Sequence, residues 1–109
     1  MTVRRFGQLI GLRREAYEEY VAAHAEVWPA VLERITASNI RNYSIYHHDG
    51  QLFAYFEYVG EDFEADMAAM AADPDTQRWW DWMMPMQVPV EGRPPEDWWL
   101  TREEVFHSD

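Results

Sequence analysis

The sequence predicts an α+β fold, in which a four-stranded antiparallel sheet carries helices on one face in the ferredoxin-like split βαβ arrangement. Hydrophobic periodicity is the first observation, because its spacing changes in the order strand, helix, strand, strand, helix, strand. The dipeptide Asp49-Gly50 is the second, since it joins the two middle strands as a hairpin. The length of 109 residues is the third, and it predicts a single domain over residues 1–109.

The first half of this order is a strand followed by a broken helix. Residues 3–12 place apolar side chains on one face at period two, which predicts a strand. Residues 14–38 carry apolar and aromatic side chains at three- and four-residue spacing, which predicts a helix. Pro29 lies inside that stretch, and proline is tolerated only in the first turn of a helix. We therefore expect a break near residues 25–28.

A hairpin opens the second half. Residues 40–47 and 51–59 are rich in Tyr, Ile and Phe, which favour strands. Asp49-Gly50 between them suits the positive φ angles of a type I′ turn. The two segments are therefore predicted to pair as antiparallel neighbours.

A second helical stretch and a last strand complete the order. Glu61 and Asp62 place negative charge ahead of this helix, and Asp73-Pro74 restarts it with a capping residue and a first-turn proline. Residues 85–95 are predicted to form a proline-rich loop, and residues 98–106 the last strand. No third layer remains to cover the other face of the sheet. We therefore expect a homodimer that packs sheet to sheet.

Composition excludes several classes of partner and site. Nine Lys and Arg against twenty Asp and Glu give a net charge of −11, which disfavours nucleic acid and membrane surfaces as partners. The absence of cysteine excludes disulfides and thiolate metal sites and fits a cytoplasmic location. The N-terminal residues lack the long apolar run of a signal peptide or a membrane span.

His24 is the first candidate for chemistry. Tyr20, His24 and Trp28 are spaced by four residues, so they project from one face of the first helix. The pattern alone favours a core-facing stripe with a buried, hydrogen-bonded histidine. The functional interpretation is proton transfer, because an imidazole can donate and accept a proton near neutral pH.

Other candidates are less specific. Trp79 and Trp80 are adjacent on a helix, so one can enter the core while the other faces a cleft. His47 and His48 are neighbours on a strand and point to opposite faces, so no metal site is expected. Glu103-Glu104 is expected to be exposed. Motifs for nucleophilic, nucleotide-dependent or redox chemistry are missing, so nucleophilic and nucleotide-dependent catalysis have no support in the sequence.

Four blocks of sequence, in the same order and with compatible spacing, resemble the L-rhamnose mutarotase family over nearly the whole chain. They are Tyr17-Glu18-Glu19-Tyr20 with His24 and Val27-Trp28-Pro29; Asn42-Tyr43-Ser44-Ile45-Tyr46 with Leu52-Phe53-Ala54; Gln77-Arg78-Trp79-Trp80; and Glu104-Val105-Phe106. No single block is decisive, and their combination carries the resemblance.

The resemblance implies a dimeric α+β barrel that interconverts the α and β anomers of L-rhamnose, or of a related 6-deoxy sugar, without metal or cofactor. It implies that His24 is the proton donor of the reaction. It also implies that Tyr20, Tyr43, Trp79 and Trp80 contact the sugar. The expected enzyme is therefore an isomerase of carbohydrate metabolism.

Two departures and two alternatives accompany this interpretation. His107 and the stretches 82–84 and 92–95 differ from the family pattern, which leaves the identity of the sugar open. The same barrel hosts cofactor-independent monooxygenases, and a monooxygenase would consume oxygen. A sugar-binding module without catalysis would bind the sugar and leave its anomeric exchange unchanged.

Overall fold

The computed structural model describes residues 2–109, and its helices and strands follow the order predicted from the sequence except for one additional short strand before the last. Within these residues every helix is too short or too polar to cross a lipid bilayer. The elements are β1 (Arg4–Leu12), η1 (Arg14–Ala16), α1 (Tyr17–Ala25), α2 (Pro29–Ala37), β2 (Ile40–His48), β3 (Gln51–Tyr58), α3 (Phe63–Ala72), α4 (Pro74–Met83), η2 (Met84–Met86), β4 (Gln87–Val88) and β5 (Leu100–Arg102).

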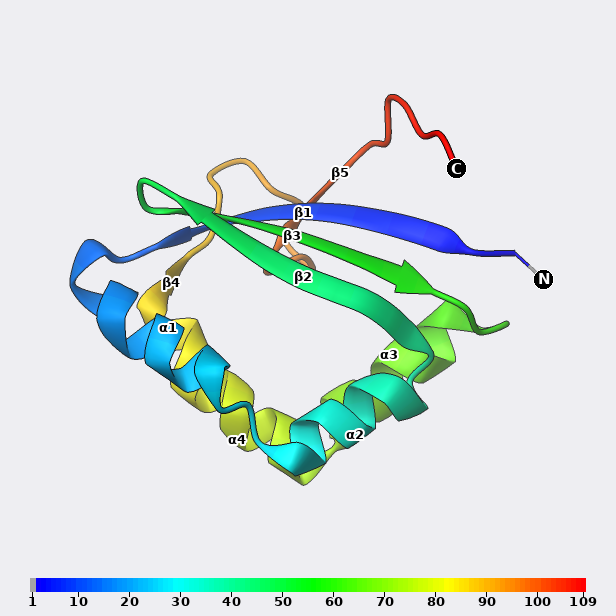
Figure 1. Ribbon diagram of the computed structural model, residues 1–109, viewed down its shortest axis with the longest axis horizontal. Helices are drawn as coiled ribbons and strands as arrows, with labels where there is room; N and C mark the ends of the chain where they lie inside the picture. The colour runs from blue at the N-terminus through cyan, green and yellow to red at the C-terminus, as the bar shows by residue number, and fades with distance from the viewer. Residues whose placement is uncertain (1) are drawn as a thin grey trace.

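One antiparallel sheet forms a single layer, and the helices lie along one of its faces (Figure 1). The strand order is β2-β3-β1-β4, and β5 also pairs with β1. This order is that of the ferredoxin-like arrangement, so the predicted fold class is confirmed.

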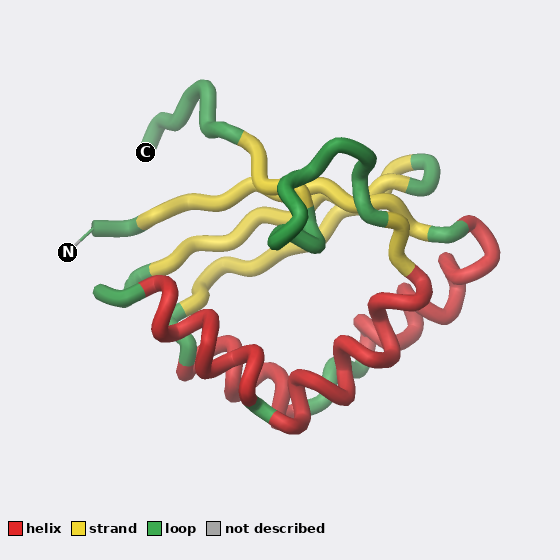
Figure 2. The backbone as a smooth tube through the Cα atoms, turned by 180° about the vertical axis from the view of Figure 1, so that it is seen from behind, coloured by secondary structure: helices red, strands yellow, loops and turns green. Residues whose placement is uncertain are grey.

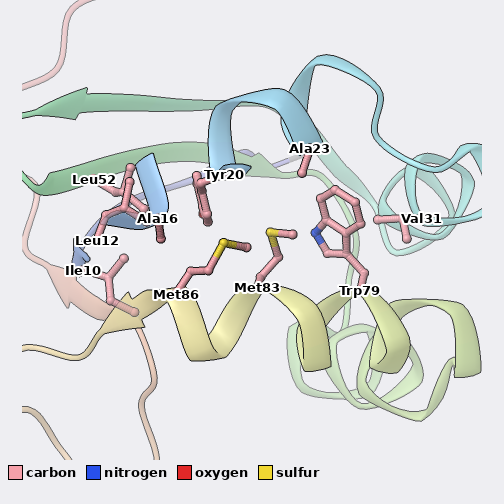
Figure 3. Close-up of a cluster of buried hydrophobic side chains, with 10 residues drawn as sticks. All are labelled: Ile10, Leu12, Ala16, Tyr20, Ala23, Val31, Leu52, Trp79, Met83 and Met86. Atoms are coloured by element: carbon pink, nitrogen blue, oxygen red, sulfur yellow. The ribbon is translucent and has the colours of Figure 1, made fainter. Parts of the chain in front are cut away.

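Strand alternation places the core between the sheet and the helices. On β1, Ile10 and Leu12 are buried, and on β3 Leu52 is buried on the same face. They pack in one cluster with Trp79 and Met83 of α4 and with side chains from α1 and α2 (Figure 3). The opposite face of the sheet has no helix over it (Figures 1 and 2).

The break in the first helix is confirmed. Helix α1 ends at Ala25, and α2 begins at Pro29. Trp28 precedes the proline with ψ 133°, an extended conformation. This geometry has a steric cause, because the proline ring disfavours a helical conformation in the residue before it. The chain therefore turns at this point, and α1 and α2 cover different parts of the sheet.

The hairpin turn and the starts of α3 and α4 also agree with the predictions. Asp49 and Gly50 both have positive φ, 44° and 79°, as a type I′ turn requires. The carboxylate of Asp62 accepts from the backbone N–H of Ala65, and that of Asp73 accepts from Thr76. These bonds cap the N-termini of α3 and α4.

The predicted last strand, residues 98–106, was wrong in length, and the predicted loop before it contains a strand. Two short strands share the edge of β1: β4 pairs with Gly11 and Leu12, and β5 pairs with residues 7–9. Pro89 follows β4 directly and cannot donate a ladder hydrogen bond, so the strand ends there. Residues 103–109 leave the sheet on the side opposite the helices (Figure 2).

Candidate active site

Two adjoining cavities lie between the sheet and the helices. One, of about 610 Å³, is enclosed mainly by α1, α2 and β2, and the other, of about 500 Å³, extends toward α4, β1 and the segment before β5. Both volumes are within the range of about 300–1,000 Å³ that is usual for small-molecule sites. Four of the five predicted site residues line both cavities: Tyr20, His24, Tyr43 and Trp79. Trp80 lines only the second.

His24 lies in the last turn of α1 with its ring between two aromatic side chains. The ring of Tyr20 is 4.3 Å away between centroids, and that of Trp79 is 5.4 Å away in an edge contact. His24 Nδ1 lies 2.8 Å from the backbone oxygen of Tyr20. That carbonyl can only accept, so Nδ1 carries a hydrogen and donates it. Within residues 2–109, Nε2 has no hydrogen-bond partner, and it is therefore the nitrogen left for proton transfer.

Tyr20 is almost completely buried on the same helix face, one turn before His24. Its hydroxyl oxygen accepts a hydrogen bond from Gln87 Nε2 at 3.0 Å. Burial raises the pKa of Tyr20, and the bond from Gln87 offsets part of that rise. Tyr20 is therefore a neutral phenol at physiological pH.

Tyr43 reaches the cavities because of an irregularity in β2. The register shifts by one residue between Arg41 and Ser44, and Asn42 has φ 52° within this β-bulge. The bulge places the ring of Tyr43 5.5 Å from that of Phe56, which is on the helix-covered face. Burial of its hydroxyl, with a smaller contribution from nearby Tyr20, raises the pKa of Tyr43 to about 12.

The two adjacent tryptophans of α4 occupy different environments, as the helical spacing predicted. Trp79 is 6% exposed and lies edge-on to both His24 and Trp28, at 5.4 and 5.1 Å between centroids. Trp80 is 37% exposed. Trp79 therefore belongs to both the core and the cavity wall, whereas Trp80 lies at the wall of the second cavity only.

Sequence reasoning missed several residues of the cavity walls, among them Gln87, Trp98 and His47. Gln87 and Trp98 lie on β4 and in the segment before β5, where a loop and a strand had been predicted, so nothing in the pattern indicated them. His47 lines the first cavity and contacts the ring of Tyr17 at 4.6 Å. It points to the helix side because it pairs with the inward-facing Leu52, and this alternation could have been read from the sequence.

The walls combine apolar surface with a few polar groups. Glu103 and Glu104 are both exposed, as expected, and Glu104 pairs with Arg5 at 2.7 Å on the open face of the sheet. Within residues 2–109, no group of three His, Cys, Asp or Glu side chains is arranged to hold a metal ion. The arrangement provides one imidazole nitrogen for proton transfer, two neutral phenols for hydrogen bonding and indole surface for apolar contact.

Comparison with known proteins gives a consistent result. The family model described as L-rhamnose mutarotase matches residues 5–108. An L-rhamnose mutarotase of Lactiplantibacillus plantarum is 36% identical over 107 residues, which are 96% of this chain and 98% of that protein. One of Bacillus subtilis is 33% identical over 109 residues, 98% of this chain and 100% of that protein.

A solved structure supports the fold. The crystal structure of an L-rhamnose mutarotase from Formosa agariphila superposes with a TM-score of 0.76 and covers 97% of this chain and 99% of that one. The sequence identity between the two is 21%, so this similarity bears on the fold alone.

Proposed function

The chain belongs to the L-rhamnose mutarotase family, and from this premise we propose that His24 transfers the proton by which it interconverts the anomers of L-rhamnose. The enzyme is an isomerase, since substrate and product differ only in configuration at the anomeric carbon. The observation that carries the role of His24 is the convergence of His24, Tyr20, Tyr43 and Trp79 on the wall shared by two cavities.

Mutarotation is a pair of proton transfers around one bond cleavage. The ring oxygen gains a proton, the anomeric hydroxyl loses one, and the bond from the anomeric carbon to the ring oxygen breaks to give an aldehyde. Rotation about the adjacent carbon–carbon bond and reclosure on the other face give the second anomer. Protonated His24 donates from Nε2 to the ring oxygen and takes the proton back on closure. Its bond from Nδ1 to the carbonyl of Tyr20 fixes which nitrogen reacts.

We assign the complementary base to water or to a carboxylate of the second cavity. Within residues 2–109 no carboxylate lines the first cavity, whereas Glu96 and Asp97 line the second. The hydroxyls of Tyr20 and Tyr43 have raised pKa values and stay protonated at neutral pH. His47 Nε2 already accepts from the backbone N–H of Gly50 at 3.1 Å, so its lone pair is engaged.

The aromatic side chains hold the sugar in position. Tyr20 and Tyr43 orient its hydroxyl groups by hydrogen bonding. Trp79 and Trp80 contact the apolar face of the ring and the methyl group at carbon 6. This division follows from side-chain chemistry, because the phenols offer hydroxyl groups and the indoles offer apolar surface at the cavity walls.

The experiment that tests this role is anomeric exchange of L-rhamnose followed by NMR saturation transfer. We expect the wild-type protein to accelerate exchange and His24→Ala to lose most of the acceleration, by about 10²–10⁴-fold, the usual contribution of a general acid or base. His48→Ala is the matched control, because His48 lies on the opposite face of the sheet from the cavities.

The possible outcomes separate the reaction from the residue. If wild-type protein leaves the exchange of L-rhamnose and of other deoxy sugars at the uncatalysed rate, the activity itself is contradicted. If the wild type is active and His24→Ala equals it, another group transfers the proton.

A homodimer is part of this proposal, supported by the uncovered face of the sheet. Tyr46, Phe53, Leu9 and Leu100 are cross-strand neighbours and form an apolar row across β2, β3, β1 and β5. Tyr46 is 65% exposed and Phe53 39%. An added Cβ at Gly7, beside this row on β1, would meet no atom within 4 Å. Such a surface fits close approach by the sheet of a second copy.

A further inference from the structure

A chain of hydrogen bonds runs from the segment before β5 to the site. The indole N–H of Trp98 donates to Gln87 Oε1 at 2.8 Å, and Gln87 Nε2 donates to the hydroxyl of Tyr20 at 3.0 Å. Gln87 is 6% exposed and Tyr20 4%, so water does not compete freely for these groups. Within residues 2–109, Gln87 has no other side-chain hydrogen-bond partner.

The direction of these hydrogen bonds is determined by the indole of Trp98. An indole nitrogen can only donate, so the group of Gln87 that faces it is the carbonyl oxygen. The amide NH₂ of Gln87 then faces Tyr20 and donates to it. The hydroxyl oxygen of Tyr20 is thereby an acceptor in this bond, and its own hydrogen remains for another partner. Within residues 2–109 no acceptor for that hydrogen is found, and Tyr20 lines both cavities.

We propose that Trp98 and Gln87 are positioning residues that hold Tyr20 as a hydrogen-bond donor to an oxygen of the bound sugar. The inference rests on the proposed function, because it assigns a polarity to one sugar contact of that site. A phenol that already accepts a hydrogen bond is also a stronger donor, since consecutive bonds polarise one another. Tyr20 is thus set to stabilise negative charge on a sugar oxygen as the ring opens.

The surrounding structure holds this chain in place from both ends. The backbone of Gln87 pairs with Leu12 of β1, which fixes the start of its side chain. Trp98 lies beneath the guanidinium of Arg93, 5.7 Å from its ring centroid. Arg93 Nε in turn donates to the backbone oxygen of Asp97 at 2.6 Å. The loop between β4 and β5 therefore acts as a support for the site.

The decisive variant is Gln87→Glu, which keeps the shape and reverses the polarity. An ionised carboxylate accepts from Trp98 and can only accept from Tyr20, so the hydroxyl hydrogen of Tyr20 turns away from the sugar. We expect kcat/KM for L-rhamnose exchange to fall by roughly ten- to hundredfold. Gln87→Met removes the hydrogen bond and leaves the hydroxyl of Tyr20 free to rotate. For this variant kcat/KM should fall only a few-fold.

A pH profile distinguishes a change in the direction of the hydrogen bond at Tyr20 from a general structural effect of the substitution. A protonated carboxyl donates through its O–H and accepts through its C=O, as the amide does. The activity of Gln87→Glu relative to wild type should therefore approach one at low pH and fall as the carboxyl ionises with rising pH. The ratio for Gln87→Met should stay constant over the same range, because methionine does not titrate.

Trp98→Phe tests the first member of the chain. It removes the donor that orients Gln87, so the amide can flip, and we expect activity to fall by several-fold. Trp82→Phe is the control for loss of an indole donor, because the indole of Trp82 also donates to a single acceptor, Glu19 at 2.7 Å. Trp82 lines neither cavity, and its ring lies 5.5 Å from that of Trp79. Circular dichroism and denaturation of each variant report whether it is folded.

The same data separate the two proposals. Wild-type protein without exchange activity contradicts the proposed function itself. An active wild type with equal, pH-independent losses for Gln87→Glu and Gln87→Met contradicts the polarity of Tyr20 and leaves the function intact. A loss in Trp82→Phe equal to that in Trp98→Phe shows that an indole donor matters only for packing, and overturns the role of Trp98.

Discussion

Single residues of the site differ in how strongly the fold constrains them. Tyr20 and Trp79 are buried, and each also lines the cavities, so a substitution there changes packing and binding together. Trp80 contributes to one cavity wall and is 37% exposed. Function and stability are therefore separable at some positions of this site and inseparable at others.

The tryptophan pair provides a direct test of this difference. Trp79→Phe should lower the free energy of unfolding by about 1–3 kcal/mol, because it leaves a cavity beside Met83 and Val31. Trp80→Phe should change it by less than about 0.5 kcal/mol and mainly raise KM. Urea denaturation and saturation-transfer kinetics measure the two effects. Equal losses of stability in both variants would contradict the assignment.

The hydroxyl of Tyr43 is predicted to ionise only at high pH. Burial of its hydroxyl raises its pKa to about 12, above the value of about 10 for an unfolded tyrosine. A raised pKa means that the fold favours the neutral phenol, so this stabilisation is complete below about pH 10 and is lost as the pH rises toward 12. The difference in ultraviolet phenolate absorbance between wild type and Tyr43→Phe should appear near pH 12. A difference near pH 10 would show that the hydroxyl is solvated.

At the scale of elements, local chemistry determines where helices and strands begin and end. Pro29 starts α2, Asp62 and Asp73 cap α3 and α4, and Pro89 ends β4. These signals act within one helical turn or one strand pair, so they operate almost independently of the rest of the fold.

The stability of the hairpin turn is sensitive to a single substitution. Gly50→Ala places a side chain at φ 79°, which should lower the free energy of unfolding by about 1 kcal/mol. Asp49→Asn is the control, because asparagine also tolerates positive φ and suits the same turn. Denaturation of both variants measures the effect. An unchanged stability in Gly50→Ala would show that the turn relaxes to another type.

At the scale of the whole molecule, the uncovered sheet face predicts self-association. Two copies packed sheet to sheet would bury the apolar row that contains Phe53 and Leu9. Phe53→Glu should raise the dimer dissociation constant by about a hundredfold or more, because it buries unpaired like charges. Sedimentation equilibrium measures this. Tyr17→Glu, on the helix side, should leave the dissociation constant unchanged, and a wild-type monomer would contradict the dimer.

The cytoplasmic location stays a prediction from cysteine content.

Sequence by itself determined the features that depend on neighbours along the chain. The type I′ hairpin, the break before Pro29 and the two capped helices follow from dihedral preferences and short-range hydrogen bonds. The placement of Tyr20 and His24 on one helix face follows from the helical period. With the family resemblance, these features were sufficient for the fold class and for four residues that share the cavity wall.

Only the tertiary structure decided the features that depend on partners far along the chain. The β-bulge that turns Tyr43 inward is defined by pairing with β3, and simple alternation from Ile40 would have turned it outward. The strand β4 exists because β1 offers it an edge, and it brings Gln87 within hydrogen-bonding distance of Tyr20, 67 residues away. Hydrophobic periodicity records which side chains are buried, whereas the register between strands determines which of them meet.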